Sequence, residues 1–441
     1  MSFVSTTPAE QAEMLKTIGL TSTGEFFEHI PEALRVTSWD LPPGESEMAV
    51  RARLAQLANR GGEARVCFLG GGYYDHFIPA AVDALASRGE FLTAYTPYQP
   101  EAAQGTLQSI YEYQSAICRL TDMDFANASL YDGGTAVFEA ATMAVRLTRR
   151  RRIVCHASLN PRYRAILATH TANLEVELID GDDPAGAACV VVQNPGFLGE
   201  VHDFTALAER CHEAGALLVL SFYPLSLGLL KTPGAMGADI AVAEGQSLGV
   251  PLGFGGPYLG ILATRKEHLR RMPGRLAAAT EDAQGRRGFV LTLQAREQHI
   301  RREKAMSNIC SNEALIALRA LIYLCLLGKE GLREAAIQCH AKAEYLKQQL
   351  GFARLLNSGP TFNEFAVRLP REAQEVCMAL AKQGYLAGLP LSALGQGEET
   401  DLLIAVTEQR TRAQLDAFAG AMACACRQAQ PDRESGNGTD F

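Results

Sequence analysis

The sequence predicts an α/β protein built on a large, mainly parallel β-sheet, with a smaller α+β unit near the C-terminal end. Short apolar runs alternate with amphipathic segments between residues 153 and 263. Such alternation indicates parallel strands whose two faces are covered by helices. We expect four parts, which are a helical arm (1–60), a large α/β domain (61–328), a small α+β domain (329–427) and a disordered tail (428–441).

The composition is that of an ordinary globular protein, and it excludes several classes of function. The chain has 441 residues and a net charge of −8, so it has no general electrostatic attraction to nucleic acid or to an anionic membrane. No apolar run approaches the roughly 20 residues that a membrane span needs. The N-terminus lacks a secretory signal, and the eleven cysteines show no paired spacing. These features favour a reducing, cytoplasmic location and no metal site.

The N-terminal arm is expected to be helical and to lack a core of its own. Thr7-Pro8 is typical of a helix start, and a second helix is expected over Glu45–Arg60. Phe26 and Phe27 begin an apolar stripe between the two. The arm is small and polar, so we expect it to pack on the main body or on a partner subunit.

Two irregular segments follow near the start of the body. The strand Val66–Leu69 leads into Gly70–Gly72, but the glycine spacing fails the dinucleotide-binding fingerprint. Further on, the segment from Tyr95 to Glu101 contains two prolines, which exclude a regular helix. Its tyrosines, glutamine and glutamate indicate a contact surface, although a structural loop with packed tyrosines would have the same composition.

Helices are expected over Gln104–Leu120 and Val137–Arg149, and Gly133-Gly134-Thr135 precedes the second of them. Two interpretations of this turn remain open. It is either an anion or cofactor site, because unpaired N–H groups and the helix dipole point there, or a plain turn with Thr135 as N-cap.

The body continues as strands and helices in regular order. Strands are expected at 153–156, 174–179, 188–192 and 216–220, with helices at 160–170 and 203–214. Asp239–Ala263 then has the pattern of a strand, a glycine-rich, ligand-facing loop and a second strand. Sites in such sheets lie beyond the carboxyl ends of the strands.

The remaining segments are more charged or belong to the C-terminal unit. Residues 265–302 are rich in arginine and are interpreted as a solvated excursion with an exposed loop at Arg286–Gly288, although some charges could meet an anionic ligand. A Ser/Asn-rich turn around Ser307-Asn308 precedes a long helix, Glu313–Gly328. Beyond it we expect helices at 331–350, 371–383 and 411–427 and strands at 362–368 and 402–406.

Several segments together resemble one family, the pyridoxal-phosphate-dependent glycine decarboxylase, or P-protein of the glycine cleavage system. They are GGGYYDHFIPAAV, YTPYQPEAAQGTLQSIYEYQ, DFANASLYDGGTAVFEA, EGQSLGVPLGFGGPYLG, REKAMSNICSNEAL and IAVTEQRTRAQLDAF. The match runs from about residue 2 to about residue 425 and resembles the N-terminal half of the family, which in many bacteria is a separate chain called subunit 1 (alpha). YTPYQPE and EGQSLGVPLGFGGP are its most specific motifs.

This resemblance implies the type I pyridoxal-phosphate fold, which is aspartate-aminotransferase-like, and an enzyme that works as a hetero-oligomer, with two copies of each subunit. In the family, pyridoxal phosphate is bonded to a lysine of subunit 2 and acts as the electron sink while glycine loses carbon dioxide. The aminomethyl group passes to the lipoyl arm of the H-protein and reduces its disulfide, so the activity is that of a glycine dehydrogenase (aminomethyl-transferring, decarboxylating).

Two positions depart from what a cofactor site needs. Position 246 is Gln, which cannot form an imine as a lysine would. Tyr223 falls at or near the acid that holds the pyridine nitrogen protonated, and a tyrosine is not charged near neutral pH. The resemblance therefore implies a chain that holds no working cofactor and completes its partner's pocket. The pocket residues implied are Tyr95, Tyr98, Gln99 and Glu101, with Gly133, Gly134, Thr135, Ser307 and Asn308 as further candidates.

Three other functions remain open from the sequence. A degenerate fold could serve as a non-catalytic scaffold or binding subunit, although the intact YTPYQPE favours an enzyme. A free-standing cofactor enzyme would have to use Lys231 or Lys304, and neither lies in the expected loop. A nucleotide-binding dehydrogenase would need a fingerprint that the chain lacks.

Overall fold

The computed structural model describes residues 6–36, 38–59, 65–92 and 96–427. The chain divides into two compact units, Met1–Glu63 and Ala64–Phe441, and each is described by itself. The expected tail, 428–441, lies outside the described residues. No helix within the described ranges is both long enough and apolar enough to cross a membrane. The expected division of the body between residues 328 and 329 stays a prediction.

The N-terminal unit contains the helices α1 (Pro8–Thr17) and α2 (Glu47–Asn59) and two short 3₁₀ turns. The predicted start of α1 is confirmed, because Thr7 and Glu10 form a reciprocal capping box in which the Glu10 N–H donates to Thr7 Oγ1 at 3.3 Å. No residue of α1 or α2 is buried. The unit therefore has no core of its own, as the sequence indicated.

The second unit is built on a seven-stranded sheet with the order β2-β8-β7-β6-β5-β3-β4. Its strands are β2 (Phe125–Ala126), β3 (Arg152–Cys155), β4 (Glu177–Asp180), β5 (Cys189–Asn194), β6 (Leu217–Phe222), β7 (Ile240–Glu244) and β8 (Gly260–Thr264). The strands from β4 to β7 pair in parallel, and β8 and β2 are antiparallel. The predicted mainly parallel sheet and the strand–loop–strand unit at 239–263 are confirmed.

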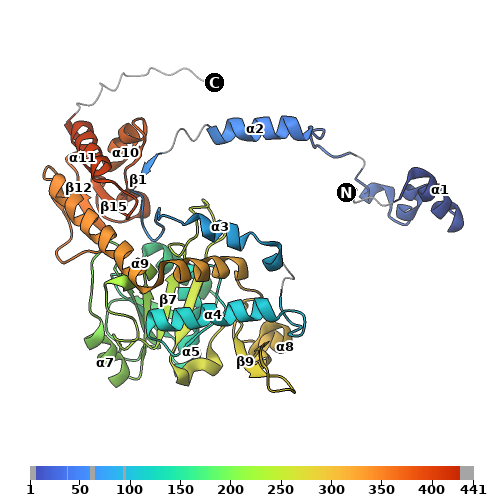
Figure 1. The fold of residues 1–441 in the computed structure, drawn as a ribbon, viewed down its shortest axis with the longest axis horizontal. Coiled ribbons are helices and arrows are strands. Elements are labelled where there is room, and N and C mark those ends of the chain that lie inside the picture. The colour runs from blue at the N-terminus through green and yellow to red at the C-terminus, as the bar shows by residue number, and fades with distance from the viewer. Residues whose placement is uncertain (1–5, 37, 60–64, 93–95, 428–441) are drawn as a thin grey trace. The chain divides into compact units, whose positions relative to one another are not determined.

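Helices cover both faces of this sheet (Figure 1). They are α3 (Ala80–Ala86), α4 (Gln104–Thr121), α5 (Gly133–Thr148), α6 (Pro161–Thr171), α7 (Thr205–Glu213) and α9 (Ala314–Gln349). Successive residues of β7 point to opposite faces, as the strand period of two requires. Ala241 and Ala243 pack in a core with α4, α7 and α9, and Ile240 and Val242 pack in a second core with α5 and α6.

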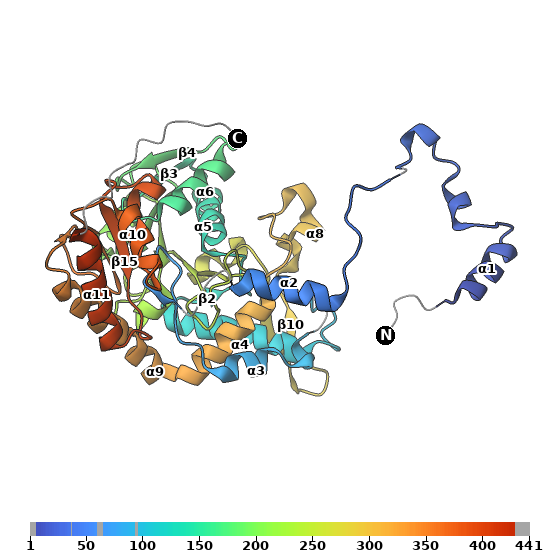
Figure 2. The ribbon, with the colours of Figure 1, turned by 90° about the horizontal axis from the view of Figure 1, so that it is seen from above.

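The C-terminal part of this unit has a four-stranded antiparallel sheet with the order β11-β12-β15-β14. Its elements are β11 (Arg354–Leu355), β12 (Glu364–Arg368), β14 (Leu389–Pro390), β15 (Asp401–Ala405), α10 (Ala373–Ala381) and α11 (Arg412–Arg427). Helix α9, which leads into this part, is broken at Gly328, where φ is 58°. Figure 2 shows α9 passing from the region of α3 and α4 toward α11.

The start of the second unit packs into its C-terminal part. Strand β1 (Val66–Cys67) pairs in parallel with β13 (Tyr385–Leu386), more than 300 residues later. The ring of Phe68 stacks on that of Phe418, with 3.8 Å between centroids. The strand expected at Val66–Leu69 is present as β1, but its partner β13 was not predicted, because a two-residue strand is too short to show a period.

The start of α5 differs from the N-cap that the sequence offered. Asp132, in extended backbone, is the N-cap and accepts the Thr135 N–H at 2.8 Å. Thr135 therefore lies inside the first turn, and its hydroxyl bonds Asp132 Oδ2 at 3.0 Å. The sequence did not predict that α5 begins at Gly133, because glycine is a poor helix former.

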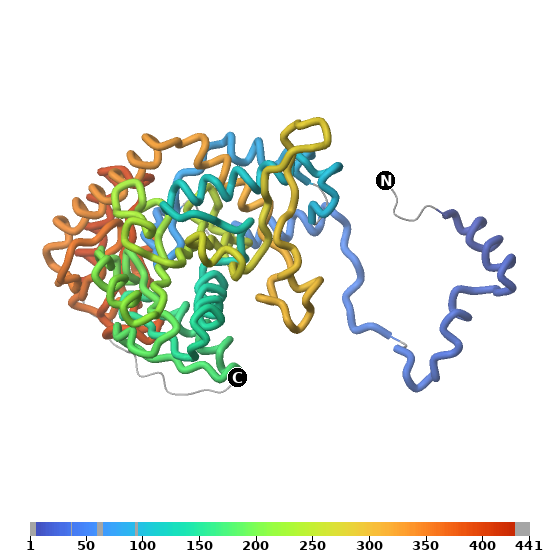
Figure 3. Tube along the Cα trace, turned by 90° about the horizontal axis from the view of Figure 1, so that it is seen from below, coloured from blue at the N-terminus to red at the C-terminus, as the bar shows by residue number. Residues whose placement is uncertain are grey.

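The arginine-rich segment is also more ordered than predicted. Strands β9 (Ala277–Glu281) and β10 (Arg287–Leu291) form an antiparallel hairpin, which Figure 3 traces as a narrow loop at the edge of the unit. Phe289 and Leu291 pack with Leu107 and Ile110 of α4. Arg287 and Gly288 thus lie in a strand and not in a loop. The hairpin was not predicted, because charged residues flank its short apolar stretches in the sequence. A short helix, α8 (Gln298–Arg301), follows.

The C-terminal sheet supplies a test of this core. Leu402 of β15 is fully buried, whereas Leu355 of β11 is 44% exposed. We expect Leu402→Ala to lower the free energy of unfolding by about 2–5 kcal/mol, because it removes buried surface and leaves a cavity. The matched Leu355→Ala should cost less than about 1 kcal/mol. Urea unfolding followed by circular dichroism measures both, and equal losses would contradict this packing.

Candidate functional site

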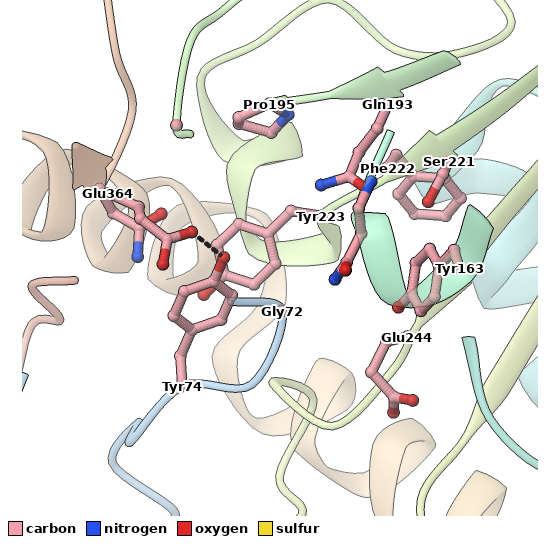
Figure 4. A pocket seen from close by; sticks show the side chains of 13 residues that line it. Gly72, Tyr74, Tyr163, Gln193, Pro195, Ser221, Phe222, Tyr223, Glu244 and Glu364 are labelled. Atoms are coloured by element: carbon pink, nitrogen blue, oxygen red, sulfur yellow. Dashed lines mark hydrogen bonds between the residues drawn. The ribbon is translucent and has the colours of Figure 1, made fainter. Parts of the chain in front are cut away.

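A small cavity lies at the carboxyl ends of β5, β6 and β7, where sites in parallel sheets are expected (Figure 4). Its volume is about 30 Å³. A space of this size holds one or two water molecules, whereas ligand pockets usually measure roughly 300–1,000 Å³. The lining residues are Gly72, Tyr74, Asn160, Tyr163, Gln193, Pro195, Gly199, Ser221, Phe222, Tyr223, Glu244, Asn363 and Glu364. No lysine is among these described residues.

Glu244, at the end of β7, closes the cavity beside the start of α5. Its Oε2 accepts the Gly133 N–H at 2.9 Å, and its Oε1 accepts the N–H groups of Gln246 at 3.0 Å and Leu259 at 3.2 Å. Burial raises the pKa of Glu244 to about 8, against these hydrogen bonds, which lower it. The contact needs a glycine, because a Cβ at Gly133 would lie 2.5 Å from the Tyr163 hydroxyl. The helix start that could bind an anion therefore meets a side chain of the same protein.

Gln246 lies two residues beyond β7 and is 2% exposed. Its Oε1 accepts the Tyr74 N–H at 2.9 Å, and its Nε2 donates to the carbonyls of Tyr74 at 3.0 Å and Val250 at 2.8 Å. Both ends of the amide are therefore used within the chain. This side chain fixes the segment around Tyr74 beside the carboxyl end of β7.

Tyr74 occupies the other side of the cavity, as Figure 4 shows. Its hydroxyl donates to Glu364 Oε2 at 2.8 Å, and its ring lies 4.6 Å from that of Tyr223. Glu364 Oε1 also accepts the Gly71 N–H at 2.7 Å. Burial raises the pKa of Glu364 to about 7, although these two hydrogen bonds lower it. Aromatic rings and a carboxyl group with a raised pKa thus fill this side.

Tyr223 belongs to a buried chain of polar groups behind the cavity. Its hydroxyl contacts His76 Nε2, and His76 Nδ1 bonds Glu408 Oε2 at 2.6 Å. The Cys339 thiol donates to the same oxygen at 3.4 Å. Burial acts to raise the pKa of Glu408, but the hydrogen bond and charge of His76 lower it to about 2. Donor atoms of His76, Cys339 and Glu408 lie within 4.8 Å of one another, close enough to hold a metal ion, but they already bond one another.

Tyr98 and the Ser307–Cys310 turn, which are far apart in sequence, meet at Arg275. The guanidinium of Arg275 lies 5.7 Å from the Tyr98 ring centroid, and its Nη2 donates to the Cys310 carbonyl at 2.6 Å. Arg275 is 3% exposed, and its Nε and Nη1 have no hydrogen-bond partner among the described residues. Two of the predicted pocket segments therefore share one buried cation.

The structure places the remaining predicted residues as follows. Tyr95 lies outside the described residues, and Gln99 and Glu101 are exposed. Gly133 and Gly134 are buried and Thr135 is half-buried, and Ser307 bonds Glu139 of the same helix. Asn308 is exposed. Their contact with a partner's pocket stays a prediction.

The two other lysines weighed from the sequence are remote from the cavity. Lys231 Nζ bonds Thr205 Oγ1 at 2.6 Å and pairs with Asp203 at 3.3 Å. Lys304 is exposed, and neither lysine lines the cavity.

Sequence reasoning missed Tyr74 and Arg275. Tyr74 stands in Tyr73-Tyr74-Asp75-His76, directly after a short strand, and this dense polar and aromatic run was the available signal. Arg275 gave no distinct signal, because it is one of many arginines in a segment read as solvated.

Comparison with known proteins identifies one family. The family model described as glycine cleavage system P-protein matches residues 1–422. A protein of Solidesulfovibrio magneticus, named probable glycine dehydrogenase (decarboxylating) subunit 1, is 53% identical, with 95% of this chain and 98% of that protein covered. A protein of Geotalea daltonii with the same name is 51% identical, over 96% of this chain and 99% of that protein.

Solved structures show the same relationship. A crystal structure of glycine decarboxylase (P-protein) of the glycine cleavage system, in inhibitor-bound form, is 44% identical, has a TM-score of 0.90 and covers 96% of this chain and 100% of that one. Aspartate aminotransferase from Thermus thermophilus is 19% identical, has a TM-score of 0.55, and covers 82% of this chain and 99% of that one. The fold is that of the type I pyridoxal-phosphate enzymes, as predicted.

The pKa of Glu364 makes a testable prediction about stability and pH. The folded pKa, about 7, exceeds the value of roughly 4.3 for an unfolded glutamate, so the folded state binds more protons between these pH values. The free energy of unfolding should therefore fall as pH rises through this window. Glu364→Gln should remove the part of this decrease in the free energy of unfolding that comes from Glu364.

The measurement is the urea midpoint of wild type and Glu364→Gln at a series of pH values from 4.5 to 8, these limits being set roughly by the two pKa values. The exposed Glu372 supplies a control variant, Glu372→Gln, whose midpoint should follow wild type. Parallel curves for wild type and Glu364→Gln would show that Glu364 does not titrate in this window.

Proposed function

The chain belongs to the glycine cleavage system P-protein family, as its subunit 1, and we propose that it completes an active site whose cofactor and lysine are supplied by subunit 2. The enzyme of the family is glycine dehydrogenase (decarboxylating). In this proposal, glycine is decarboxylated with pyridoxal phosphate on subunit 2, and the aminomethyl group is passed to the lipoyl arm of the H-protein. Two copies of each subunit and a cytoplasmic location stay predictions.

The closed cavity is the observation that carries this proposal. Pyridoxal phosphate needs a phosphate site, a lysine and an acid at the ring nitrogen, and the residues present here do not fit it. Glu244 occupies the α5 start, Gln246 is bonded at both ends of its amide, and the Tyr223 hydroxyl contacts His76. The space that remains is about 30 Å³.

What this chain contributes is therefore a surface for the partner's pocket. Gln99 and Glu101 are exposed, and Tyr98 is 47% exposed while its ring is backed by Arg275 and His299. An aromatic ring held by a buried cation on one side is fixed in orientation, so its hydroxyl can position a ligand across an interface. We assign Tyr98 and Glu101 to substrate or cofactor contact in the complex.

A glycine–bicarbonate carboxyl exchange assay tests the split site. The assay contains lipoyl H-protein and either this chain alone, subunit 2 alone, or both. We expect exchange only in the mixture, because the lysine and the Tyr98 surface then lie on different chains. Exchange by this chain alone would contradict the proposal. A complex of the two chains with no exchange would instead favour a non-catalytic scaffold.

A second prediction concerns Tyr98. Tyr98→Phe should lower kcat/KM for exchange by about tenfold to hundredfold, which is the effect of losing one hydrogen bond to a charged group. Assembly with subunit 2 should be kept, since the ring remains. Tyr345, whose hydroxyl bonds Asp416 at 2.5 Å on the C-terminal part, supplies the control Tyr345→Phe. If both variants had wild-type rates, Tyr98 would have no role in the pocket.

A further inference from the structure

An exposed pocket of about 370 Å³ near the turn that follows α8 is strongly cationic. We call it the basic pocket, and its charged lining residues are Arg270, Arg271, Arg296, Arg301 and Lys304. The segment 265–304 has eleven Arg or Lys residues against five Asp or Glu residues, a net charge of +6, in a chain whose net charge is −8. The positive charge of this protein is therefore concentrated here.

The cations of the basic pocket form no ion pair within the described part of the chain, although burial lowers the pKa of Arg296 and the charge of the neighbouring Glu297 acts to raise it. Arg271 donates to the Met306 sulfur and Arg301 to the Ala295 carbonyl. The half-buried Arg296 donates from Nη1 to the Met272 carbonyl, and its Nε and Nη2 have no hydrogen-bond partner among the described residues. Like charges held together without ion pairs repel one another, so this excess of positive charge costs stability.

A second arginine cluster shows that the chain elsewhere neutralises such groups. Arg151 and Arg152 line another surface pocket, of about 600 Å³, together with Glu175 and Glu177. Arg151 pairs with Glu175, and Arg152 pairs with Glu177 at 3.1 Å. The lack of acids at the basic pocket is therefore a local property and not a general feature of this surface.

The basic pocket adjoins the surface assigned above to the active site. It shares Arg296 and Met306 with a narrow cleft that is also lined by Arg275, Ser307 and Cys310. Arg275 in turn lies beneath the Tyr98 ring. A protein bound at the basic pocket would therefore sit next to Tyr98.

We propose that the basic pocket docks an acidic patch of the lipoyl-carrying H-protein and so aims the lipoyl arm at the active site. This inference rests on the proposed function. Cores of permanent subunit interfaces are depleted of charged residues, so five unpaired cations do not suit a permanent contact with subunit 2. A carrier protein must dock, react and leave, and charge complementarity speeds encounter without requiring tight binding.

The test compares the wild-type complex of both subunits with two other complexes. One contains a triple variant of this chain and the other contains a double variant. Arg270→Gln, Arg271→Gln and Lys304→Gln together remove three charges of the basic pocket. Arg151→Gln and Arg152→Gln together are the control at the neutralised cluster. Glycine–bicarbonate exchange is measured against H-protein concentration at low and high salt, and again with free lipoamide, which is uncharged and needs no docking surface.

We expect the triple variant to raise the KM for H-protein about tenfold at low salt, with kcat unchanged within about twofold. High salt should narrow the difference, because it screens the charges of the wild type. Activity with lipoamide and the KM of the control should remain those of the wild type. An unchanged KM would overturn the proposal, and so would an equal loss with lipoamide, or loss of subunit 2 from the complex.

Direct binding separates this inference from the proposed function. If the wild-type mixture showed no exchange with either acceptor, the proposed function would fail. Titration of labelled H-protein into the wild-type complex and the triple-variant complex would still measure whether the basic pocket binds H-protein. Weaker binding to the triple variant would support it, and equal or absent binding to both would overturn it.

Discussion

The contact between Glu244 and the start of α5 is the constraint on which the rest of the site depends. Three backbone N–H groups point at one carboxyl group, which meets the positive end of the helix dipole inside the protein. A negatively charged ligand at the same place would have to displace this carboxyl from its hydrogen bonds. Once Glu244 lies there, the space beyond it can be filled by Tyr74, Tyr163 and Gln246.

The fold is therefore complete although the cavity at the carboxyl ends of its strands measures only about 30 Å³. The two cores on either side of the sheet depend on apolar residues such as Ile240 and Ala241, which alternate along β7. Most residues that close the cavity, such as Tyr74 and Gln246, stand beyond the ends of strands and outside those cores, whereas Tyr163 of α6 lines the cavity and also packs in the second core. Tyrosines and carboxyl groups therefore fill the space at the carboxyl ends of β5, β6 and β7 while the strands keep their packing.

The fold was largely predictable because long, periodic segments dominate it. The strands at 188–192 and 216–220 and the helix at 104–120 show their periods plainly in the sequence. Strand β13, its pairing with the predicted β1, and the hairpin β9–β10 were missed, because two-residue strands have no period and charged residues flank the hairpin. For the site, Gln246 was recognised by what it lacks, whereas Tyr74 and Arg275 act through tertiary contacts across long stretches of chain.

The unpaired cations of the basic pocket suit a transient contact with a carrier protein better than a permanent contact with subunit 2. A contact that persists can bury apolar surface, and its core is depleted of charged residues. A contact that must form and break in each turnover cannot bury much, because tight binding would slow release. Unpaired surface cations attract a partner over about 8–10 Å and hold it weakly. The basic pocket shares Arg296 and Met306 with the cleft lined by Arg275, which lies beneath Tyr98, so a partner held there would lie beside the surface proposed to complete the active site.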